Sequence, residues 1–221
     1  MNAPDNERSV ETAIHGRFLM VPPATAGPAP ILVGFHGYAE NADLHLERLR
    51  AIPGSDRWLI VSIQALHRFY QRRTNTVVAC WMTRQDREAA IADNVAYVTK
   101  CMDAVAAEYP TLPTVVFAGF SQGVAMAFRA AASAAQRTIG VIAVGGDIPP
   151  EIAPSALERV SAALLIRGAT DNWYSEKQFA EDEQRLRHSA VAVRAVTLNA
   201  GHNWAGDLNL PASQLLQELA R

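Results

Sequence analysis

Short apolar runs recur along the chain, at residues 31–35, 58–63, 114–119, 139–144 and 162–168. They are rich in β-branched residues and almost free of charge, which is typical of strands covered on both faces of a parallel sheet. Residues 191–198 predict a further strand, and a loose alternation over residues 10–21 predicts an opening strand or hairpin.

Helical periodicity fills the gaps between these runs. The longest case covers residues 87–109, where apolar residues recur at 91, 95, 98, 102 and 105, before Pro110 and Pro113. Shorter helices are predicted at residues 44–50, 122–136, 176–188 and 212–220, the first capped by Asn41 or Asp43. Because strand and helix alternate throughout, we predict an α/β fold of three layers, with a mostly parallel central sheet flanked by helices.

The length of 221 residues suits one α/β domain and is short for two. We find no internal repeat or linker, so we predict a single domain over residues 1–221. Residues 67–84 show no clean period, and we expect an irregular insertion there, near the active site, because long irregular segments in compact domains are often functional.

Charge and composition narrow the classes of partner. The formal net charge is −2 and no basic cluster gathers, so the sequence gives no basis for binding nucleic acid or an anionic membrane surface. Cys80 and Cys101 are too few for a disulfide framework and lack metal-ligand spacing, so we expect two reduced thiols and no metal, with a single disulfide as the alternative. The polar N-terminus is followed by no apolar segment, and no run reaches the roughly 18 apolar residues of a membrane span. We expect a cytoplasmic protein without stable membrane insertion.

The third apolar run ends in Gly119-Phe120-Ser121-Gln122-Gly123, and an Ala-rich helical segment follows. A serine between two glycines at a strand-to-helix turn is typical of a nucleophile in a strained conformation, where strand and helix backbones pass close together. The first N–H groups of the helix would point at the group under attack. Ser121 is therefore our candidate nucleophile. The alternative is an ordinary turn that needs glycine for its backbone alone.

Other strands deliver complementary groups to the same edge of the predicted sheet. Ligands of such sheets bind beyond the carboxyl ends of the strands, where Asp171 follows the run at 162–168 and His202 follows the last strand. His202 would activate Ser121 as a base, and Asp171 would orient the imidazole and stabilise its cationic form. The chain order of serine, acid and histidine is that of an α/β-hydrolase.

These assignments have alternatives. Asp171 fits equally well as a cap of the 176–188 helix, and His202 alone fits a surface loop. Asp147 also follows a strand, although Pro149 and Pro150 after it favour a loop role. We favour Asp171 and His202 because they complete the set that Ser121 needs.

A tetrahedral intermediate of acyl transfer needs fixed hydrogen-bond donors for its oxyanion. Our candidates are the backbone N–H of Gln122, at the start of the helix, and that of Tyr38, after His36-Gly37. We interpret His36 as a structural residue that holds this loop.

The chain resembles the phospholipase/carboxylesterase branch of the α/β-hydrolases, which includes acyl-protein thioesterase-like enzymes. The similarity covers residues 31–219. It is carried by Gly34-Phe35-His36-Gly37, Gly119-Phe120-Ser121-Gln122-Gly123, Gly168-Ala169-Thr170-Asp171 and Gly201-His202-Asn203-Trp204. The motif around Ser121 is fairly specific for this branch, and the others are common across the superfamily. The resemblance implies an α/β-hydrolase fold and a cofactor-free serine esterase or thioesterase that works through an acyl-enzyme.

The sequence departs from the family pattern at three places. After His36-Gly37, the family often has one variable residue followed by Gly-Asp, and this chain has Tyr38-Ala39-Glu40. Val124 stands where the family usually has a second glycine after Ser-Gln-Gly. Trp173-Tyr174 lies after the acid, in the region where the family typically has Val-Pro. Two of these changes add aromatic bulk at the rim of the predicted site, which bears on the choice of substrate.

Several side chains are candidates for the substrate pocket. The aromatic residues Phe69, Tyr70, Trp81 and Trp173 suit an apolar acyl or aryl group, or they fill the core beneath a loop. The arginines of the same region either bind an anionic substrate group or form a solvated face: Arg68, Arg72, Arg73 and Arg84. Cys80 either lines the pocket or is a small buried hydrophobe.

We therefore predict a serine carboxylesterase that hydrolyses a small-molecule ester through an acyl-enzyme, with no cofactor. A thioesterase or lysophospholipase with the same triad differs only in the leaving group. A ligand-binding protein that keeps the fold without catalysis is the alternative from another class. The sequence leaves open the acyl chain length, the leaving group and whether the chain forms a homodimer.

Overall fold

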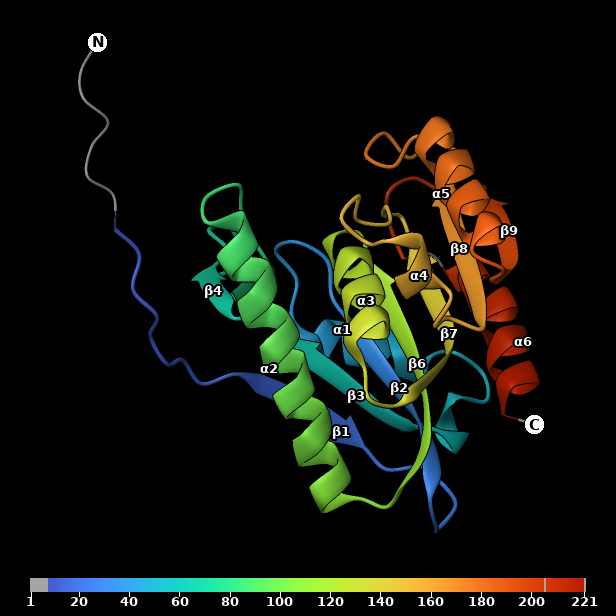
Figure 1. Cartoon of the computed structure of the whole chain (residues 1–221), viewed down its shortest axis with the longest axis horizontal. Helices are drawn as coiled ribbons and strands as arrows, with labels where there is room; N and C mark the ends of the chain where they lie inside the picture. The colour runs from blue at the N-terminus through green and yellow to red at the C-terminus, as the bar shows by residue number, and fades with distance from the viewer. Residues whose placement is uncertain (1–7, 205, 221) are drawn as a thin grey trace.

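The computed structural model describes residues 8–204 and 206–220. The strands of its main sheet are β1 Arg17–Val21, β2 Ala29–Phe35, β3 Leu59–Gln64, β6 Thr111–Phe120, β7 Arg137–Val144, β8 Ala162–Gly168 and β9 Ala192–Leu198. Their order across the sheet is β1-β3-β2-β6-β7-β8-β9 (Figure 1). β1 runs antiparallel to β3, and every other neighbouring pair is parallel. The predicted mostly parallel sheet is confirmed.

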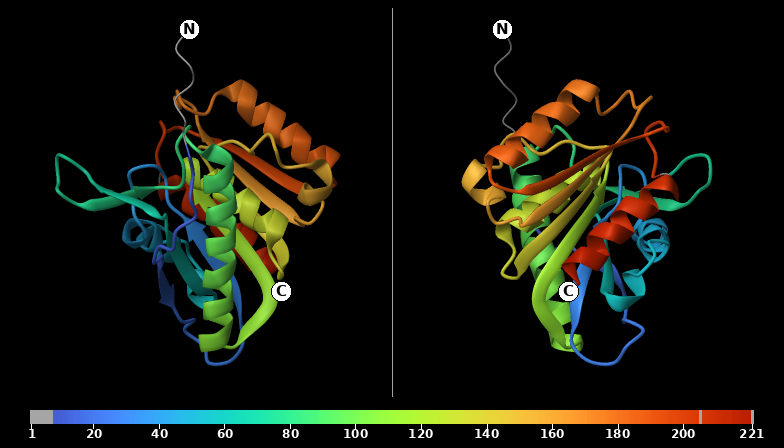
Figure 2. Two further views of the ribbon diagram at one scale, coloured as in Figure 1. Left: turned by 60° about the vertical axis from the view of Figure 1, so that its left-hand side comes forward. Right: turned by 90° about the vertical axis from the view of Figure 1, so that its right-hand side faces the viewer.

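Helices cover both faces of this sheet and give three layers (Figure 2). They are α1 Ala42–Arg50, α2 Arg87–Glu108, α3 Gln122–Ser133, α4 Pro154–Leu157, α5 Glu176–His188 and α6 Asn209–Leu219. Apolar residues of α2, α3, α4 and α5 share one core with Ile31 and Val33 of β2. Leu32, between them in the sequence, belongs to the opposite core with residues of α1 and α6. Successive residues of this strand are buried on opposite sides, as its unbroken apolar sequence predicts.

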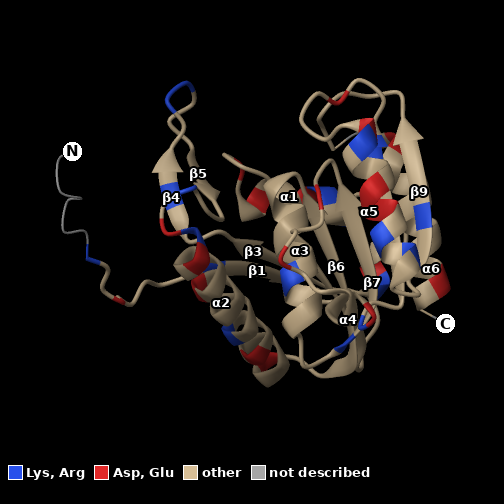
Figure 3. Ribbon diagram, turned by 45° about the horizontal axis from the view of Figure 1, so that its top comes forward, with Lys and Arg blue, Asp and Glu red and all other residues tan. Residues whose placement is uncertain are grey.

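Residues 67–84 are irregular only in part, which corrects the prediction of an irregular insertion. β4 (His67–Tyr70) and β5 (Val77–Cys80) pair antiparallel as a hairpin beside the main sheet. The hairpin projects from the body of the molecule, with basic residues in its loop (Figure 3). Each strand has only four residues and every residue of β4 is exposed, so the alternation that would reveal a strand is too short to detect.

Some element boundaries differ from the predicted ones at the N-terminal end. Residues 10–16 form no regular structure, which confines the opening strand to β1. α1 begins two residues early because Asn41 caps it, accepting the N–H of Leu44 at 2.9 Å.

The later boundaries shift as well. α3 ends at Ser133 rather than at 136, since β7 already begins at Arg137. α6 begins at Asn209, so Pro211 lies in its first turn, where the missing N–H is tolerated. The short α4 begins at Pro154 and has only four residues, and the 3-10 turns Ser55–Arg57 and Gly206–Leu208 have three each, so all are too short for a periodic signal.

Candidate active site

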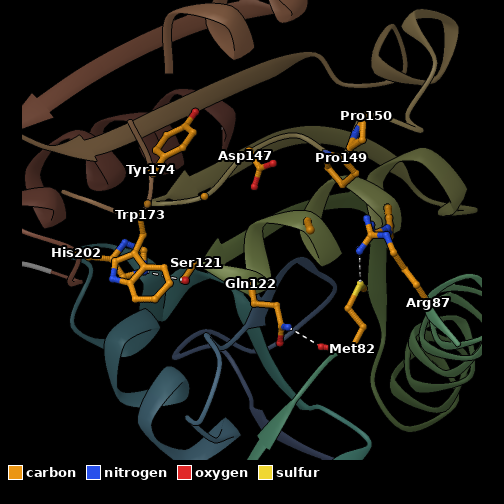
Figure 4. A pocket seen from close by; sticks show the side chains of 14 residues that line it. Met82, Arg87, Ser121, Gln122, Asp147, Pro149, Pro150, Trp173, Tyr174 and His202 are labelled. Carbon is orange, nitrogen blue, oxygen red and sulfur yellow. Dashed lines mark hydrogen bonds between the residues drawn. The ribbon is translucent and has the colours of Figure 1, made fainter. Parts of the chain in front are cut away.

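Ser121 lies in the turn between β6 and α3, at the carboxyl end of the strand (Figure 4). Its φ of 51° and ψ of −120° fall outside the regions usual for residues other than glycine. The N–H of Ser121 donates to the carbonyl oxygen of Val144 on β7 at 2.8 Å and fixes the turn. A Cβ on Gly119 would lie 2.4 Å from the carbonyl oxygen of Gly123, and a Cβ on Gly123 would lie 2.1 Å from that of Phe35. Close backbone approach therefore requires both glycines.

His202, in the loop after β9, joins Ser121 to Asp171. Its Nε2 lies 2.8 Å from the Oγ of Ser121, and its Nδ1 lies 2.8 Å from the Oδ2 of Asp171. A carboxylate can only accept hydrogen bonds, so Nδ1 carries the proton and Nε2 of the neutral ring accepts from the serine hydroxyl. The structure thus brings these three residues together in the direction that base-assisted attack requires.

Asp171 is 4% exposed, and both oxygens of its carboxylate are engaged. Oδ1 accepts the N–H of Trp173 at 2.8 Å and that of Tyr174 at 3.0 Å, while Oδ2 faces His202. Burial alone would raise the pKa of Asp171, but these hydrogen bonds hold the pKa below its usual value and keep the carboxylate ionised. The alternative of a helix cap does not hold, because Ser175 caps α5 in a capping box.

The other candidate acid, Asp147, is exposed and does not contact the histidine. It follows Gly145 and Gly146, which leave β7. Gly145, with φ of 63°, passes close to Asp171 and His202, since a Cβ there would lie 3.3 Å from each. Among these carboxylates, the partner of the His202 Nδ1 is Asp171.

The two predicted oxyanion donors lie on two different segments, the start of α3 and the loop after β2. Gln122 is the first residue of α3, where a backbone N–H has no acceptor inside the helix. Tyr38 lies in the loop after β2. The N–H of Gly37 before it donates to Oε2 of Glu40 at 2.8 Å, and the N–H of Ala39 after it donates to the carbonyl oxygen of Ala79 on β5 at 3.0 Å. The N–H of Tyr38 therefore lies between two N–H groups that are already hydrogen-bonded. Ala39 has φ of 56°, the left-handed conformation that explains glycine at this place in the family pattern. The role of both donors stays a prediction.

His36 holds this loop from inside. Its Nε2 accepts the N–H of Ala65 at 3.0 Å, which leaves Nδ1 as the protonated nitrogen, 2.7 Å from the carbonyl oxygen of Gly37. Burial lowers the pKa of His36 and favours the neutral ring. These contacts fit the structural role expected of it.

Trp81, a predicted pocket residue, lies in the core instead. Its side chain is fully buried, and its indole N–H donates to the carbonyl oxygen of His36 at 2.8 Å. Its backbone N–H donates to the side chain of Gln122, which in turn donates to the carbonyl oxygen of Met82. Trp81 therefore fixes the two segments that carry the oxyanion candidates, without lining the pocket.

Of the other aromatic candidates, Trp173 lines the cavity at Ser121, and Phe69 and Tyr70 do not. Phe69 and Tyr70 lie on the exposed β4, with the ring of Phe69 5.9 Å from that of Tyr38. Trp173 is 81% exposed, and its ring centre lies 6.3 Å from that of His202.

The cavity beside Ser121 has a volume of about 310 Å³ (Figure 4). Its walls come from the residues before and at the start of α2, from α3, from the loop after β7 and from the segment after Asp171. Besides Ser121 and His202, the lining residues are Met82, Arg87, Gln122, Ala125, Arg129, Gly145, Gly146, Asp147, Pro149, Pro150, Trp173 and Tyr174.

The arginines of this cavity are not the ones that the sequence indicates. Arg87 and Arg129 line it, whereas Arg68, Arg72, Arg73 and Arg84 do not. Arg129 lies two turns into an Ala-rich helix, where nothing in the sequence sets it apart. Cys80 is buried away from the cavity, and burial raises the pKa of its thiol, as for a small hydrophobe.

Among the described residues, no three His, Cys, Asp or Glu side chains gather as ligands for a metal ion. No helix in this part of the chain has the length and apolar character to cross a membrane.

A model of the phospholipase/carboxylesterase family matches residues 23–205. No curated protein matches the chain in sequence. Solved structures with a similar fold include a carboxylesterase of Bacillus cereus, with 15% identity, a TM-score of 0.75 and coverage of 92% of this chain and 94% of the other. Esterase PE8 has 21% identity and a TM-score of 0.72, with coverage of 93% and 100%. Acyl-protein thioesterase 2 of Zea mays has 18% identity and a TM-score of 0.70, with coverage of 94% and 100%.

Proposed function

The chain belongs to the phospholipase/carboxylesterase family, and we propose that it is a serine hydrolase that cleaves carboxylic esters through an acyl-enzyme. The observation that carries this proposal is the hydrogen-bonded series from Ser121 through His202 to Asp171, with 2.8 Å at each step. The strained turn that presents Ser121 beside an open cavity supports it further.

The first half of the reaction forms the acyl-enzyme. Ser121 Oγ attacks the carbonyl carbon while its proton passes to Nε2 of His202. The carbonyl oxygen becomes an oxyanion, which accepts hydrogen bonds from the N–H groups of Gln122 and Tyr38. The intermediate then collapses, the bond to the alcohol oxygen breaks, and the alcohol leaves with the proton from Nε2.

The second half releases the acid. A water molecule gives a proton to Nε2 of His202 as its oxygen attacks the acyl carbon, and Ser121 leaves and regains that proton. In both halves Asp171 stays ionised and stabilises the imidazolium that forms. The chain, the ester and water supply every atom, so the proposal requires no cofactor.

The size of the cavity favours a small-molecule ester. About 310 Å³ lies at the lower end of the range for ligand pockets, which is roughly 300–1,000 Å³. A thioester is the second candidate, because the same attack gives the same acyl-enzyme and only the leaving group differs. The similar fold named as an acyl-protein thioesterase favours including it in the test.

Initial rates on p-nitrophenyl esters from acetate to palmitate, with an acyl-CoA thioester beside them, test the proposal. We expect turnover by the wild type and its loss in Ser121→Ala. Ser133→Ala, at the other end of α3, controls for the loss of a serine hydroxyl elsewhere on this element. Equal rates in wild type and Ser121→Ala would contradict the proposal and favour a ligand-binding protein. The preferred leaving group then separates esterase from thioesterase.

A further inference from the structure

The cavity at Ser121 runs along one face of α3. Ala125 and Arg129 follow Ser121 at intervals of four residues, so the three lie on the same side of the helix, and all line the cavity. Eight residues at 1.5 Å each place Arg129 about 12 Å along the axis from Ser121. Figure 4 shows Ser121 and His202 at one end of the cavity and Arg87 at the other.

Arg129 is a buried cation whose charge is paired with the carboxylate of Glu151. Its side chain is 3% exposed, and its Nε and Nη2 both donate to Oε1 of Glu151, the former at 3.0 Å. Arg129 lines the cavity, and Glu151 has little capacity left for another cation on that oxygen.

Arg87 lies beside this pair, and its charge is poorly matched. Its Nη1 contacts the sulfur of Met82 at 3.1 Å, and a thioether is a weak acceptor. Its Nη2 lies 3.7 Å from Oε2 of Glu151, beyond hydrogen-bond distance. The side chain is 46% exposed and lines the cavity. Two guanidinium groups thus share one carboxylate, and Arg87, the more exposed of the two, is held by the weaker contacts.

Asp147 is the other charged residue of the cavity lining, and it limits where an anion can bind. Asp147 lies in the loop after β7, which forms one wall of the cavity (Figure 4). Its carboxylate repels a carboxylate of a ligand that is placed near this wall. A negative group of a ligand is therefore favoured at Arg87 and disfavoured at Asp147. This uneven charge selects both the sign of the ligand group and its place.

We propose that Arg87 is a specificity-determining residue, and that the cavity takes esters with a carboxylate at the end remote from the scissile bond. A carboxylate can accept two parallel N–H bonds from one guanidinium, which suits the open donors of Arg87. This inference rests on the proposed ester hydrolysis at Ser121.

The test compares matched anionic and neutral esters. Mono-p-nitrophenyl suberate against p-nitrophenyl octanoate places the carboxylate on the acyl part. The pair 4-carboxyphenyl octanoate and 4-acetylphenyl octanoate places it on the alcohol part. For at least one pair, the ratio of kcat/KM for the anionic ester to that for the neutral ester falls about tenfold or more in Arg87→Gln. The pair that responds assigns the carboxylate to the acyl or the alcohol side.

Three further variants sharpen the result. Arg87→Lys keeps the charge but loses the paired donors, so its ratio lies between those of wild type and Arg87→Gln. Glu151→Gln keeps an acceptor for Arg129 and removes the competing charge, so its ratio rises. Arg84→Gln, an exposed arginine outside the cavity, leaves the ratio unchanged.

A ratio in Arg87→Gln within about twofold of the wild-type ratio, for both ester pairs, overturns the inference while ester hydrolysis stands. Absence of turnover on all four esters by the wild type overturns the proposed function and the inference with it.

Discussion

The carboxylate of Glu40 accepts the backbone N–H of Gly37 at 2.8 Å, within the turn that carries Tyr38. The same carboxylate binds both terminal nitrogens of Arg48, at 2.7 and 2.8 Å. The guanidinium of Arg48 lies 4.9 Å from the ring centre of Phe120, next to Ser121. Glu40 therefore holds the proposed oxyanion loop in a fixed position, although the family often has an aspartate at this place.

Replacing Glu40 by alanine should lower kcat about tenfold and change KM much less. The Tyr38 N–H would lose its orientation, and an oxyanion donor acts mainly in the transition state. Glu40→Gln keeps one acceptor and should recover part of the loss. Glu47→Ala, an exposed residue on the neighbouring helix, serves as the control. A rise in KM with kcat unchanged would contradict this positioning role.

The sequence predicts the sheet and the residues at its strand ends because both depend on local signals. Long apolar runs identify the strands, and Asp171 and His202 follow their strands within a few residues. The place of Trp81 is not local: its indole reaches the carbonyl of a residue 45 positions away. Arg87 and Arg129 come from two helices that meet only through tertiary packing. Pocket residues of this kind carry no signal in the sequence alone.

Asp171→Asn should lower kcat on the order of 10³–10⁴-fold, because the amide brings no charge to the imidazolium and does not fix its tautomer. Asp147→Asn should lower kcat far less, since the hydrogen-bond partner of His202 is Asp171. Initial rates at pH 7 for the two variants decide between these carboxylates. A larger loss in Asp147→Asn would reverse the assignment.

Acid conditions give a second readout for Asp171. Its pKa is lower in the folded chain than in the unfolded one, so its contribution to stability is present above the unfolded value and is lost as pH falls through the folded value. The difference in free energy of unfolding between wild type and Asp171→Asn should therefore shrink as the pH drops below about 4.

Gly123→Ala should lower the free energy of unfolding by about 2 kcal/mol or more. The Cβ of the alanine would lie 2.1 Å from the carbonyl oxygen of Phe35, and relieving this clash requires a shift of the backbone. Gly206→Ala is the matched control, with no atom within 4 Å of the added Cβ. Urea denaturation of both variants measures the effect. Equal stability of the two variants would contradict the close contact between α3 and β2.

Asp182→Asn should make stability less sensitive to pH. Asp182 on α5 accepts the N–H of Ile148 at 3.1 Å and the hydroxyl of Tyr174 at 2.9 Å, so it links the two loops beside the cavity. Burial raises its pKa to about 6, from 3.8 for an unperturbed aspartate. The folded chain thus binds more protons than the unfolded chain between these values, and its stability falls as pH rises through them.

The measurement for Asp182 is the free energy of unfolding of wild type and variant between pH 4 and pH 7. The value for Asp182→Asn minus that for wild type should increase with pH, because only the wild type ionises at this site. Glu181→Gln removes an exposed carboxyl from the same helix and serves as control. A difference that does not change with pH would contradict the raised pKa.

The most direct test of the central claim is reaction with a fluorophosphonate, followed by mass spectrometry of the intact protein and of its peptides. The proposed mechanism predicts one adduct per chain, located on Ser121, no adduct in Ser121→Ala, and slower labelling in Asp171→Asn. Labelling of another residue, or equal labelling of wild type and Ser121→Ala, would contradict the assignment of Ser121 as the nucleophile.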